Sequence, residues 1–308
     1  MIDFVGKRYW YFLLSGILII PGVLSLIFFG LKPGSDFKGG TDITMQFTPS
    51  VAQSDLRKEL ATVGYPDAVI QSTSEGDFIV RLPEITSDQR QTLIDGLTKG
   101  LNSTITVKNF SGVSALVASQ TVRYAVIAIL VAAIAILLYI TFAFRKMPNP
   151  FRWGTCAVIA LVHDILLVLG VFSILGKFAG VEVDTLFITG MLTVAGYSVH
   201  DTIVVFDRIR ENIVKGVSPV FEKTVNYSIL QTLGRSLNTS ITVLVVLLAL
   251  FLLGGSTIHY FVLVLLIGVT TGTYSSICNA SQLLIVWNNK EWGRFIGMKP
   301  KTAEAASK

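Results

Sequence analysis

Titratable side chains are rare within the long apolar segments of this sequence, and the few present are grouped. They are two adjacent pairs, His163-Asp164 and His200-Asp201, together with Arg235. An ionised side chain in a membrane interior is costly unless it is paired or protonated, so such residues usually serve a function. These residue types therefore predict a site that binds or transfers an ion.

Asp201 and Arg235 form the combination best suited to this chemistry. Asp201 lies about 9 Å of helix rise from Asp207, in the inner half of its segment, and Arg235 opens the next segment from the same side. If the two segments are neighbours, the side chains meet at similar depth. A carboxylate with a movable guanidinium partner has two states, ionised and paired or protonated and released, which can couple proton passage to a conformational change.

Both aspartates can also be structural, as polar groups that hydrogen-bond between helices. The pattern favours an ion-coupling role for Asp201. For Asp164 the two interpretations stay open, because His163 or a neighbouring hydroxyl group can satisfy it. His200 can extend a proton relay near neutral pH, but it points about 100° away from Asp201 on a helix, which favours packing or a lipid-facing position.

Composition indicates a membrane protein with several spans. Of the 308 residues, 52% are hydrophobic and only 15% are charged, a balance that is unusual for a soluble domain. The 25 Lys and Arg against 20 Asp and Glu form no clustered stripe, which argues against a nucleic-acid partner. Cys156 and Cys278 lie in apolar segments without His or Cys at ligand spacing, which argues against a disulfide or a metal site.

Six apolar segments are long enough to cross a hydrocarbon core about 30 Å thick. The first ends without a small-residue cleavage site, so it is predicted to be a retained anchor rather than a signal peptide. The predicted spans are Tyr9–Leu31, Tyr124–Phe144, Trp153–Leu175, Thr185–Phe206, Ser236–Gly255 and Tyr260–Trp287.

Basic residues in the short loops predict the orientation. They gather before the first span, between spans two and three, between spans four and five, and after span six, so both termini are expected in the cytoplasm. The chain then divides into the N-terminus with the first span (1–31), a periplasmic domain (32–122), five further spans (123–290) and a cytoplasmic tail (291–308). The tail is expected to be mobile and dispensable from about Lys299 onward.

The periplasmic insertion has a periodicity of its own. It predicts the order strand–helix–strand–strand–helix–strand, which is that of a small ferredoxin-like α+β domain. That fold alone does not specify a function. The predicted elements are Thr41–Phe47, Ser54–Val63 with Ser54 as the cap, Ala68–Ser72, Phe78–Leu82, Ser87–Leu101 and Ile105–Phe110.

The sixth span carries a small residue at every fourth position: Gly268, Gly272, Ser276 and Ala280. Such a ridge lets two helices approach closely and predicts tight packing rather than chemistry.

Several motifs, in order along the chain, resemble the SecD/SecF family of protein-export membrane proteins. Asp36-Phe37-Lys38-Gly39-Gly40 is similar to the signature that follows the first span of that family. His163-Asp164 matches its third span, and the run from Gly196 to Asn212 is similar to its long fourth-span motif. The fifth- and sixth-span motifs are matched by Arg235–Ser240 and Gly272–Ser276.

The resemblance implies an inner-membrane protein of the resistance-nodulation-division superfamily, forming half of a twelve-span unit with SecD. That unit associates with the SecYEG channel and YajC, and uses the proton-motive force to assist late translocation of unfolded polypeptides. Asp201 matches the acidic residue of the proton path and Arg235 its basic partner, while Asp36, Phe37, Gly39 and Gly40 are implied to support the junction between membrane and periplasmic domain. Position 200 is usually Asn in this motif and is His here, which leaves protons or sodium ions as the coupling ion.

Three other classes of protein remain to be weighed. An intramembrane aspartyl protease is disfavoured, because the Gly-x-Gly-Asp sequence of that chemistry is replaced by Ser-Val-His before Asp201, and no enzymatic activity is expected. A small-molecule exporter needs twelve spans and larger periplasmic domains. A non-motor scaffold that stabilises the SecYEG–SecD complex is the serious competitor, and it predicts that Asp201 can be neutralised without loss of export.

Overall fold

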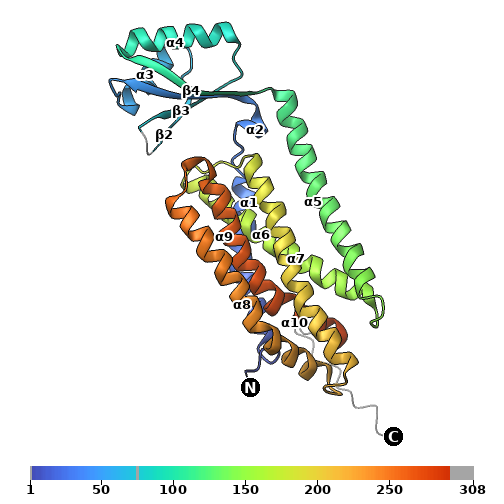
Figure 1. Cartoon of the computed structure of the whole chain (residues 1–308). Coiled ribbons are helices and arrows are strands. Elements are labelled where there is room, and N and C mark those ends of the chain that lie inside the picture. The colour runs from blue at the N-terminus through green and yellow to red at the C-terminus, as the bar shows by residue number, and fades with distance from the viewer. Residues whose placement is uncertain (1, 74–75, 292–308) are drawn as a thin grey trace.

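The computed structural model describes residues 2–73 and 76–291. A bundle of long helices forms one part of the molecule, and a small domain with a β-sheet stands on one end of it (Figure 1). The described N-terminus lies at the opposite end of the bundle. Most of the expected tail, from residue 292 onward, lies outside the described residues.

Six helical spans in the described part of the chain are long and apolar enough to cross a membrane, as predicted. The last consists of three consecutive pieces, because a π-helical segment interrupts it. The spans are α1 (Arg8–Phe29), α5 (Ala115–Ala143), α6 (Pro150–Phe178), α7 (Thr185–Val214), α8 (Phe221–Leu253), and α9 (His259–Ser275) with η2 (Ser276–Ala280) and α10 (Ser281–Asn288). A short 3-10 turn, η1 (Ser256–Ile258), precedes α9.

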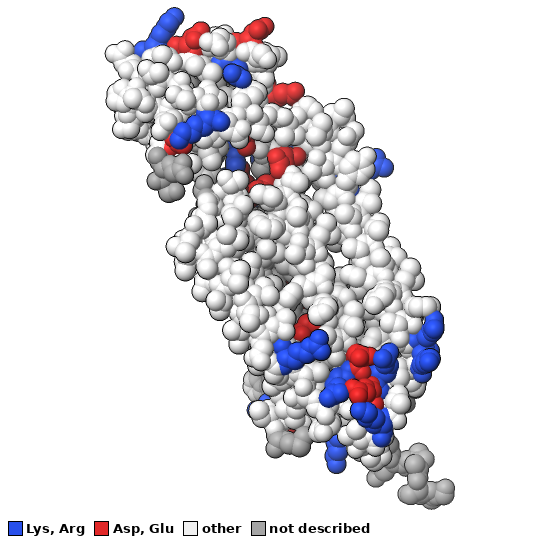
Figure 2. All heavy atoms as spheres, in the orientation of Figure 1, with Lys and Arg blue, Asp and Glu red and all other residues white. Residues whose placement is uncertain are grey.

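Figure 2 shows how charge follows this architecture. On the face drawn, charged side chains gather towards the two ends of the molecule and leave a broad uncharged zone between them. This is the distribution expected of a helix bundle whose middle lies in hydrocarbon.

The helix α8 extends well beyond the predicted fifth span. It begins at Phe221 rather than near Ser236, so Arg235 lies near the middle of the helix. The added turns are held by Val225 and Ile229, which are both fully buried and lie four residues apart on one face. This stretch contains Glu222 and Lys223, so its hydropathy is too low to indicate part of a span. Packing against the bundle stabilises the helix there.

The small domain contains the four strands and two longer helices in the predicted order. Its antiparallel sheet has the order β2-β3-β1-β4. A short helix, α2, links it to the first span. The elements are α2 (Ser35–Lys38), β1 (Gly40–Thr48), α3 (Gln53–Thr62), β2 (Val69–Ser72), β3 (Phe78–Leu82), α4 (Ser87–Leu101) and β4 (Thr104–Val113).

Alternating burial along β1 and β3 builds the core of this domain. Ile43, Met45 and Val80 are fully buried between the sheet and the two helices, which contribute Leu60 and Leu97.

The caps of the two helices differ. Thr86 and Gln89 form a capping box at the start of α4. The prediction that Ser54 caps α3 is wrong, because that helix begins at Gln53 after Ala52, which places Ser54 inside its first turn.

Close helix contacts organise the bundle. Gly22 of α1 lies against Gly170 of α6, where a Cβ on Gly22 would come 2.8 Å from the partner's Cα. On α9, a Cβ on Gly268 would overlap Val194 of α7, and one on Gly272 would lie 3.1 Å from the Cα of Ser198. These glycines let α9 pack directly on α7, the helix that carries Asp201.

Candidate functional site

Asp201 of α7 lies at the meeting point of three helical segments. Its side chain is buried, with 8% of the residue exposed. One carboxylate oxygen accepts a hydrogen bond of 2.6 Å from Ser236 of α8, and the other accepts one from Ser276 at the start of η2. Both oxygens are therefore held by hydroxyl groups, each from a different neighbouring segment.

Asp164 of α6 is fully buried and forms a second centre of the same kind. His163 Nδ1 lies 2.9 Å from one carboxylate oxygen. The other oxygen accepts hydrogen bonds of 2.6 Å from Ser198 of α7 and from Ser275 of α9. The Nε2 atom of His163 is buried and has no hydrogen-bond partner among the described residues.

The two centres are joined through adjacent residues of the last span. Ser275 bonds to Asp164 and Ser276 bonds to Asp201, because consecutive helical residues point about 100° apart. The π-helical segment begins at Ser276, and π segments occur frequently at functional sites. The small-residue ridge predicts only packing for Ser276, whereas its hydroxyl group is part of the site.

A second group of hydroxyl side chains lies one turn along α8 from Ser236, the partner of Asp201. Ser240, one turn beyond Ser236, donates to the Ser236 carbonyl oxygen at 2.8 Å. Its oxygen also lies 2.6 Å from the Thr273 hydroxyl of α9 and 2.9 Å from the Tyr197 hydroxyl of α7. Tyr197 and Ser240 both lie within the family-like motifs of their spans, but the sequence does not single out either hydroxyl group as part of the site.

Arg235 and Asp201 are not paired in this structure, contrary to the expectation that their side chains meet. Arg235 is exposed and makes no ion pair with any described residue. Ser236 takes the position facing Asp201, so its neighbour Arg235 is rotated away from it on the helix. His200 is also exposed and points away from both carboxylates, as the helical offset from Asp201 predicts.

Exposed polar residues recur along one side of α7 and along one side of α8, and we name these two sets together the α7–α8 polar face. On each helix they recur at intervals of three or four residues or multiples of these, so they lie on one side. Two of them are His200 and Arg235, and Arg235 adjoins the Ser236 that bonds to Asp201. The members are Thr189, Thr193 and His200 on α7 and Gln231, Arg235, Asn238 and Thr242 on α8.

The Asp36–Gly40 motif ties the small domain to the start of α7. One Asp36 carboxylate oxygen accepts hydrogen bonds from the backbone nitrogen (2.9 Å) and the hydroxyl group (2.6 Å) of Thr185. Phe37 packs against the apolar cluster that contains Phe187. Gly40 has a φ of 137° and lies so near the Leu82 carbonyl that a Cβ would come within 2.6 Å of its oxygen, so only glycine fits.

A charged contact adds a second link at this junction. Arg81 of β3 pairs with Glu182, in the loop between α6 and α7, and lies 3.4 Å from Asp42 of β1. Lys32 lies 3.2 Å from the other oxygen of Glu182. Burial raises the pKa of the nearby Asp184 carboxyl group, and the charge of Asp36 adds to this. The sequence gives no signal for the Arg81–Glu182 pair, because the partners belong to elements far apart in the chain.

Within residues 2–73 and 76–291, no group of three or more His, Cys, Asp or Glu side chains is placed to hold a metal ion. Cys156 and Cys278 are free and buried.

Six apolar helices around two buried, hydroxyl-bound carboxylates define a multi-pass membrane protein of the transport class. The chain belongs to the SecD/SecF family: residues 94–290 match the family described as "Protein export membrane protein SecD/SecF, C-terminal".

Relatives cover nearly the whole chain. It is 48% identical to the protein translocase subunit SecF of Thermobaculum terrenum, over 98% of this chain and 99% of that protein. It is 40% identical to the SecF subunit of Anaerolinea thermophila, over 98% of this chain and 100% of that protein. The crystal structure of SecDF, a translocon-associated membrane protein from Thermus thermophilus, superposes with a TM-score of 0.82 at 34% identity. That match covers 94% of this chain and 39% of the SecDF chain, so this chain spans about two fifths of it.

Proposed function

We propose that this chain is an accessory subunit of the Sec protein translocase that works with SecD to couple an ion gradient to protein movement across the membrane. The family relationship supports the translocation role. The observation that carries the coupling role is Asp201, a buried carboxylate whose two oxygens are held by hydroxyl groups of α8 and η2. Each of these hydroxyl groups donates to the carboxylate, so the contacts of α7 with α8 and η2 depend on the protonation state of Asp201.

Protonation of Asp201 would change these contacts in a defined way. The ionised carboxylate accepts from both Ser236 and Ser276. A proton on either oxygen turns that atom into a donor, so the serine that it faces must rotate to accept or move away. Because Ser275 adjoins Ser276 and holds Asp164, a shift of η2 would also disturb the second centre. Asp164 is thus proposed to respond to Asp201 within one network.

The signal would reach the small domain through α7. Asp201 lies on this helix, and the first residue of the helix, Thr185, is held by Asp36. Gly39 caps the end of α2, the short helix that contains Asp36, and Gly40 is the first residue of β1. A movement of α7 along its axis would therefore act on the start of β1. This supports a junction role for Asp36, Phe37, Gly39 and Gly40.

SecD is proposed to cover the α7–α8 polar face. Polar side chains that face lipid are unfavourable, and in membrane proteins such residues face protein or a hydrated cavity. The SecDF relatives combine a segment similar to this chain with a longer remainder, since this chain spans 38% of the Bacillus subtilis SecDF protein. Arg235 and His200 would then lie at the interface with SecD, where Arg235 becomes the charged partner of the ion path and His200 a flanking relay.

The coupling ion is proposed to be the proton, with sodium as the alternative. Among the described residues, two hydroxyl groups bind Asp201, and hydroxyl donors suit a carboxylate that gains and loses protons. A bare sodium ion would need further oxygen ligands at the same point, which hydrated surroundings or SecD would have to supply.

The remaining assignments follow the family. The bundle is proposed to lie in the bacterial inner membrane with both termini in the cytoplasm, in agreement with the basic loops. The small domain, with its β2-β3-β1-β4 sheet, is proposed to be ferredoxin-like and periplasmic. SecYEG, YajC and the unfolded exported polypeptide are the proposed partners of the complex.

A non-motor scaffold remains the second candidate, and one observation favours it. All four carboxylate oxygens of Asp164 and Asp201 have partners, which is also how polar residues hold helices together in membranes. In this reading the two centres fix the packing of α6, α7, α8 and α9, and the chain stabilises the SecYEG–SecD complex.

The deciding experiment measures gradient-dependent export of a secreted reporter in cells whose only copy carries Asp201→Asn. Asp207→Asn is the matched control, since Asp207 is exposed on the same helix and pairs only with Arg210 among the described residues. Arg235→Met tests the proposed partner in parallel, and the membrane content of the complex is quantified for every variant.

Loss of export in Asp201→Asn, at normal amounts of complex and with Asp207→Asn active, supports ion coupling. Normal export in Asp201→Asn refutes it and leaves the scaffold. Repeating the assay with a sodium gradient or a proton gradient alone identifies the ion.

A further inference from the structure

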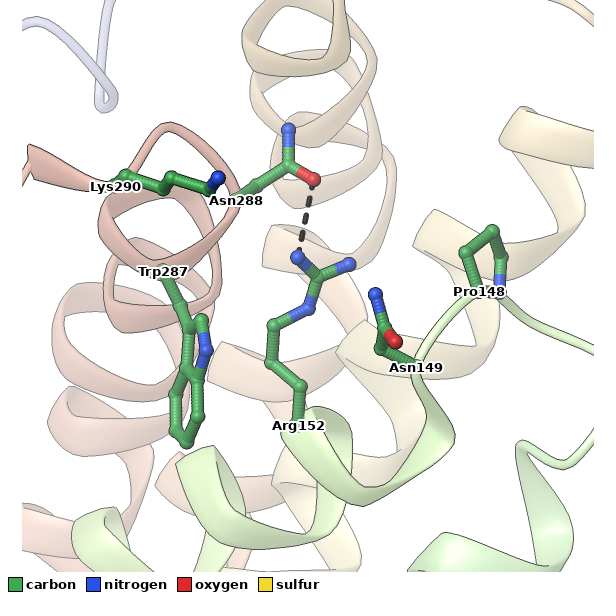
Figure 3. A pocket seen from close by; sticks show the side chains of 6 residues that line it. All are labelled: Pro148, Asn149, Arg152, Trp287, Asn288 and Lys290. Carbon is green, nitrogen blue, oxygen red and sulfur yellow. Dashed lines mark hydrogen bonds between the residues drawn. The ribbon is translucent and has the colours of Figure 1, made fainter.

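A pocket of about 520 Å³ opens between the start of α6 and the end of α10. Figure 3 shows the side chains that line it, and Arg152 points into it between the indole ring of Trp287 and the amide of Asn149. The lining residues are Pro148, Asn149, Arg152, Trp287, Asn288 and Lys290.

The pocket carries positive charge that the protein leaves uncompensated. Arg152 and Lys290 both line it, no acidic residue does, and neither forms an ion pair with a described residue. Arg152 makes one hydrogen bond, of 3.2 Å, to the amide oxygen of Asn288 (Figure 3). Its Nε atom is buried and has no partner among the described residues. A buried guanidinium nitrogen without an acceptor is costly, so an acceptor from outside the chain would satisfy it.

The carboxylate closest in sequence does not neutralise this charge. Glu291 follows Lys290 directly, but its side chain accepts hydrogen bonds from Arg8 at 2.8 Å and from Tyr9 at 2.8 Å. Asn289 donates to it at 3.0 Å. Glu291 is therefore engaged with the first helix, and the pocket stays cationic.

The ends of two candidate membrane spans place the pocket at the depth expected for lipid headgroups. Two membrane spans end beside it, since one begins at Pro150 and another ends at Asn288. Phe151 is 59% exposed at the same level, and Trp287 lines the pocket itself. Aromatic side chains of this kind mark the interface between hydrocarbon and water. An occupant can therefore keep its acyl chains beside the helices and its charged group in the pocket.

We propose that this pocket binds the phosphate group of an anionic phospholipid. Arg152 would donate to the phosphate through Nε and a terminal nitrogen, the paired geometry that guanidinium groups offer to phosphates. Lys290 adds a second charge from the opposite wall. Basic pockets between membrane helices on the cytoplasmic side bind headgroups of this class. The chain's own residues 292–308 are a poor occupant by charge, because they contain four Lys or Arg and one Glu.

The proposal is independent of ion coupling, because none of the lining residues belongs to the Asp164 or Asp201 centres. It is tested by titrating the purified full-length chain in neutral detergent with phosphatidylglycerol, phosphatidylcholine or inorganic phosphate and counting bound molecules by native mass spectrometry. The wild type is compared with Arg152→Gln, with Lys290→Gln and with the double variant. Arg145→Gln/Lys146→Gln is the matched control, since it removes two exposed charges from the neighbouring loop that do not line the pocket.

We expect one phosphatidylglycerol to be retained by the wild type and the control, and affinity to fall roughly thirty-fold in the double variant, at about 1 kcal/mol per basic residue. Phosphatidylcholine should bind weakly and equally to all variants. Equal loss in the control and the double variant would refute a defined site, because general surface charge would then explain the binding. Full competition by inorganic phosphate would also overturn the proposal, since the occupant would then be a soluble anion and not a lipid.

Discussion

Ser236 of α8 donates a hydrogen bond of 2.6 Å to the carboxylate of Asp201 on α7. This contact replaces the ion pair with Arg235 that the sequence suggests, and it leaves the arginine on the outer face of the same helix. A hydroxyl group can donate to an ionised carboxylate or accept from a protonated one. The pair can therefore persist through a protonation cycle while the geometry around it changes.

The first prediction concerns this hydroxyl group. Ser236→Ala removes a donor to a buried acidic group, and hydrogen bonds to charged groups contribute about 1.5–3 kcal/mol. We expect gradient-driven export to fall by roughly ten-fold or more at normal protein levels. Thr239→Ala, at an exposed position on the same helix, should export normally. The hydroxyl group has no part in coupling if Ser236→Ala matches the wild type.

The second prediction concerns the stability supplied by Asp164. Asp164→Ala leaves His163, Ser198 and Ser275 without their shared acceptor in a fully buried position. Breaking a buried charged contact of this kind costs about 3–5 kcal/mol. The melting temperature of the purified chain in detergent should fall clearly, whereas Asp207→Ala at an exposed position should change little. Equal melting temperatures would show that the α6–α7–α9 network does not stabilise the bundle.

The third prediction concerns the contact between α9 and α7. Gly268→Ala places a methyl group where the side chain of Val194 already lies, and overpacking of this kind costs about 1–3 kcal/mol. Gly234→Ala on α8 has nothing within 4 Å of the new methyl group and should be neutral or slightly stabilising. Thermal unfolding of both variants in the same detergent makes the comparison. Unchanged stability of Gly268→Ala would mean that α9 can shift away from α7 at no cost.

The fourth prediction concerns the junction between the two parts of the molecule. Glu182→Gln removes the charge that holds Arg81 of β3, and a partly exposed pair of this kind contributes only about 0–1 kcal/mol to stability. The expected effect is therefore on mobility. Spin labels at Gln71 and Ala179, both exposed, should report a broader distance distribution between sheet and bundle by pulsed electron paramagnetic resonance. Glu84→Gln, also exposed, serves as the control, and equal widths in both variants would assign the junction to the Asp36 motif alone.

The fifth prediction is a pH dependence at the end of the bundle that carries the N-terminus. Burial alone would raise the pKa of Glu291, but hydrogen bonds from Asn289, Arg8 and Tyr9 outweigh it, so the pKa lies below its ordinary value of 4.5. The stabilisation is therefore complete above pH 4.5 and is lost as the pH falls through the folded-state pKa. The melting temperature of the wild type should exceed that of Glu291→Gln at pH 7, and the difference should shrink below about pH 4.5. A difference that does not change with pH would rule out the ionised carboxylate as its source.

Two kinds of sequence signal were sufficient by themselves to predict the membrane spans and the elements of the small domain. Hydropathy over long windows predicts six spans, because a span must satisfy its backbone internally and expose apolar side chains to lipid. The periodicity of apolar residues and the turn residues predict the strands and helices of the small domain, where Phe78–Leu82 and Ser87–Leu101 begin and end at the expected residues. Both signals are local, so neighbours in the chain are enough to carry them.

The extent of the helices was not determined by these signals. Hydropathy places the start of the fifth span at Ser236, yet α8 begins at Phe221, because Val225 and Ile229 find an apolar surface only in the assembled bundle. The same limit applies to the π segment at Ser276, which has no compositional mark.

The sequence by itself determined that two membrane spans carry acidic residues, at positions 164 and 201, because an aspartate within a long apolar segment can be recognised from the sequence alone. Only the tertiary structure decided which groups touch them. Ser275 and Ser276 are adjacent in the chain but bond to different carboxylates. Ser236, and not the expected Arg235, contacts Asp201. The reason is geometric: a rotation of about 100° per residue directs neighbouring side chains to different helices, and only the packing of those helices fixes which partner each one meets.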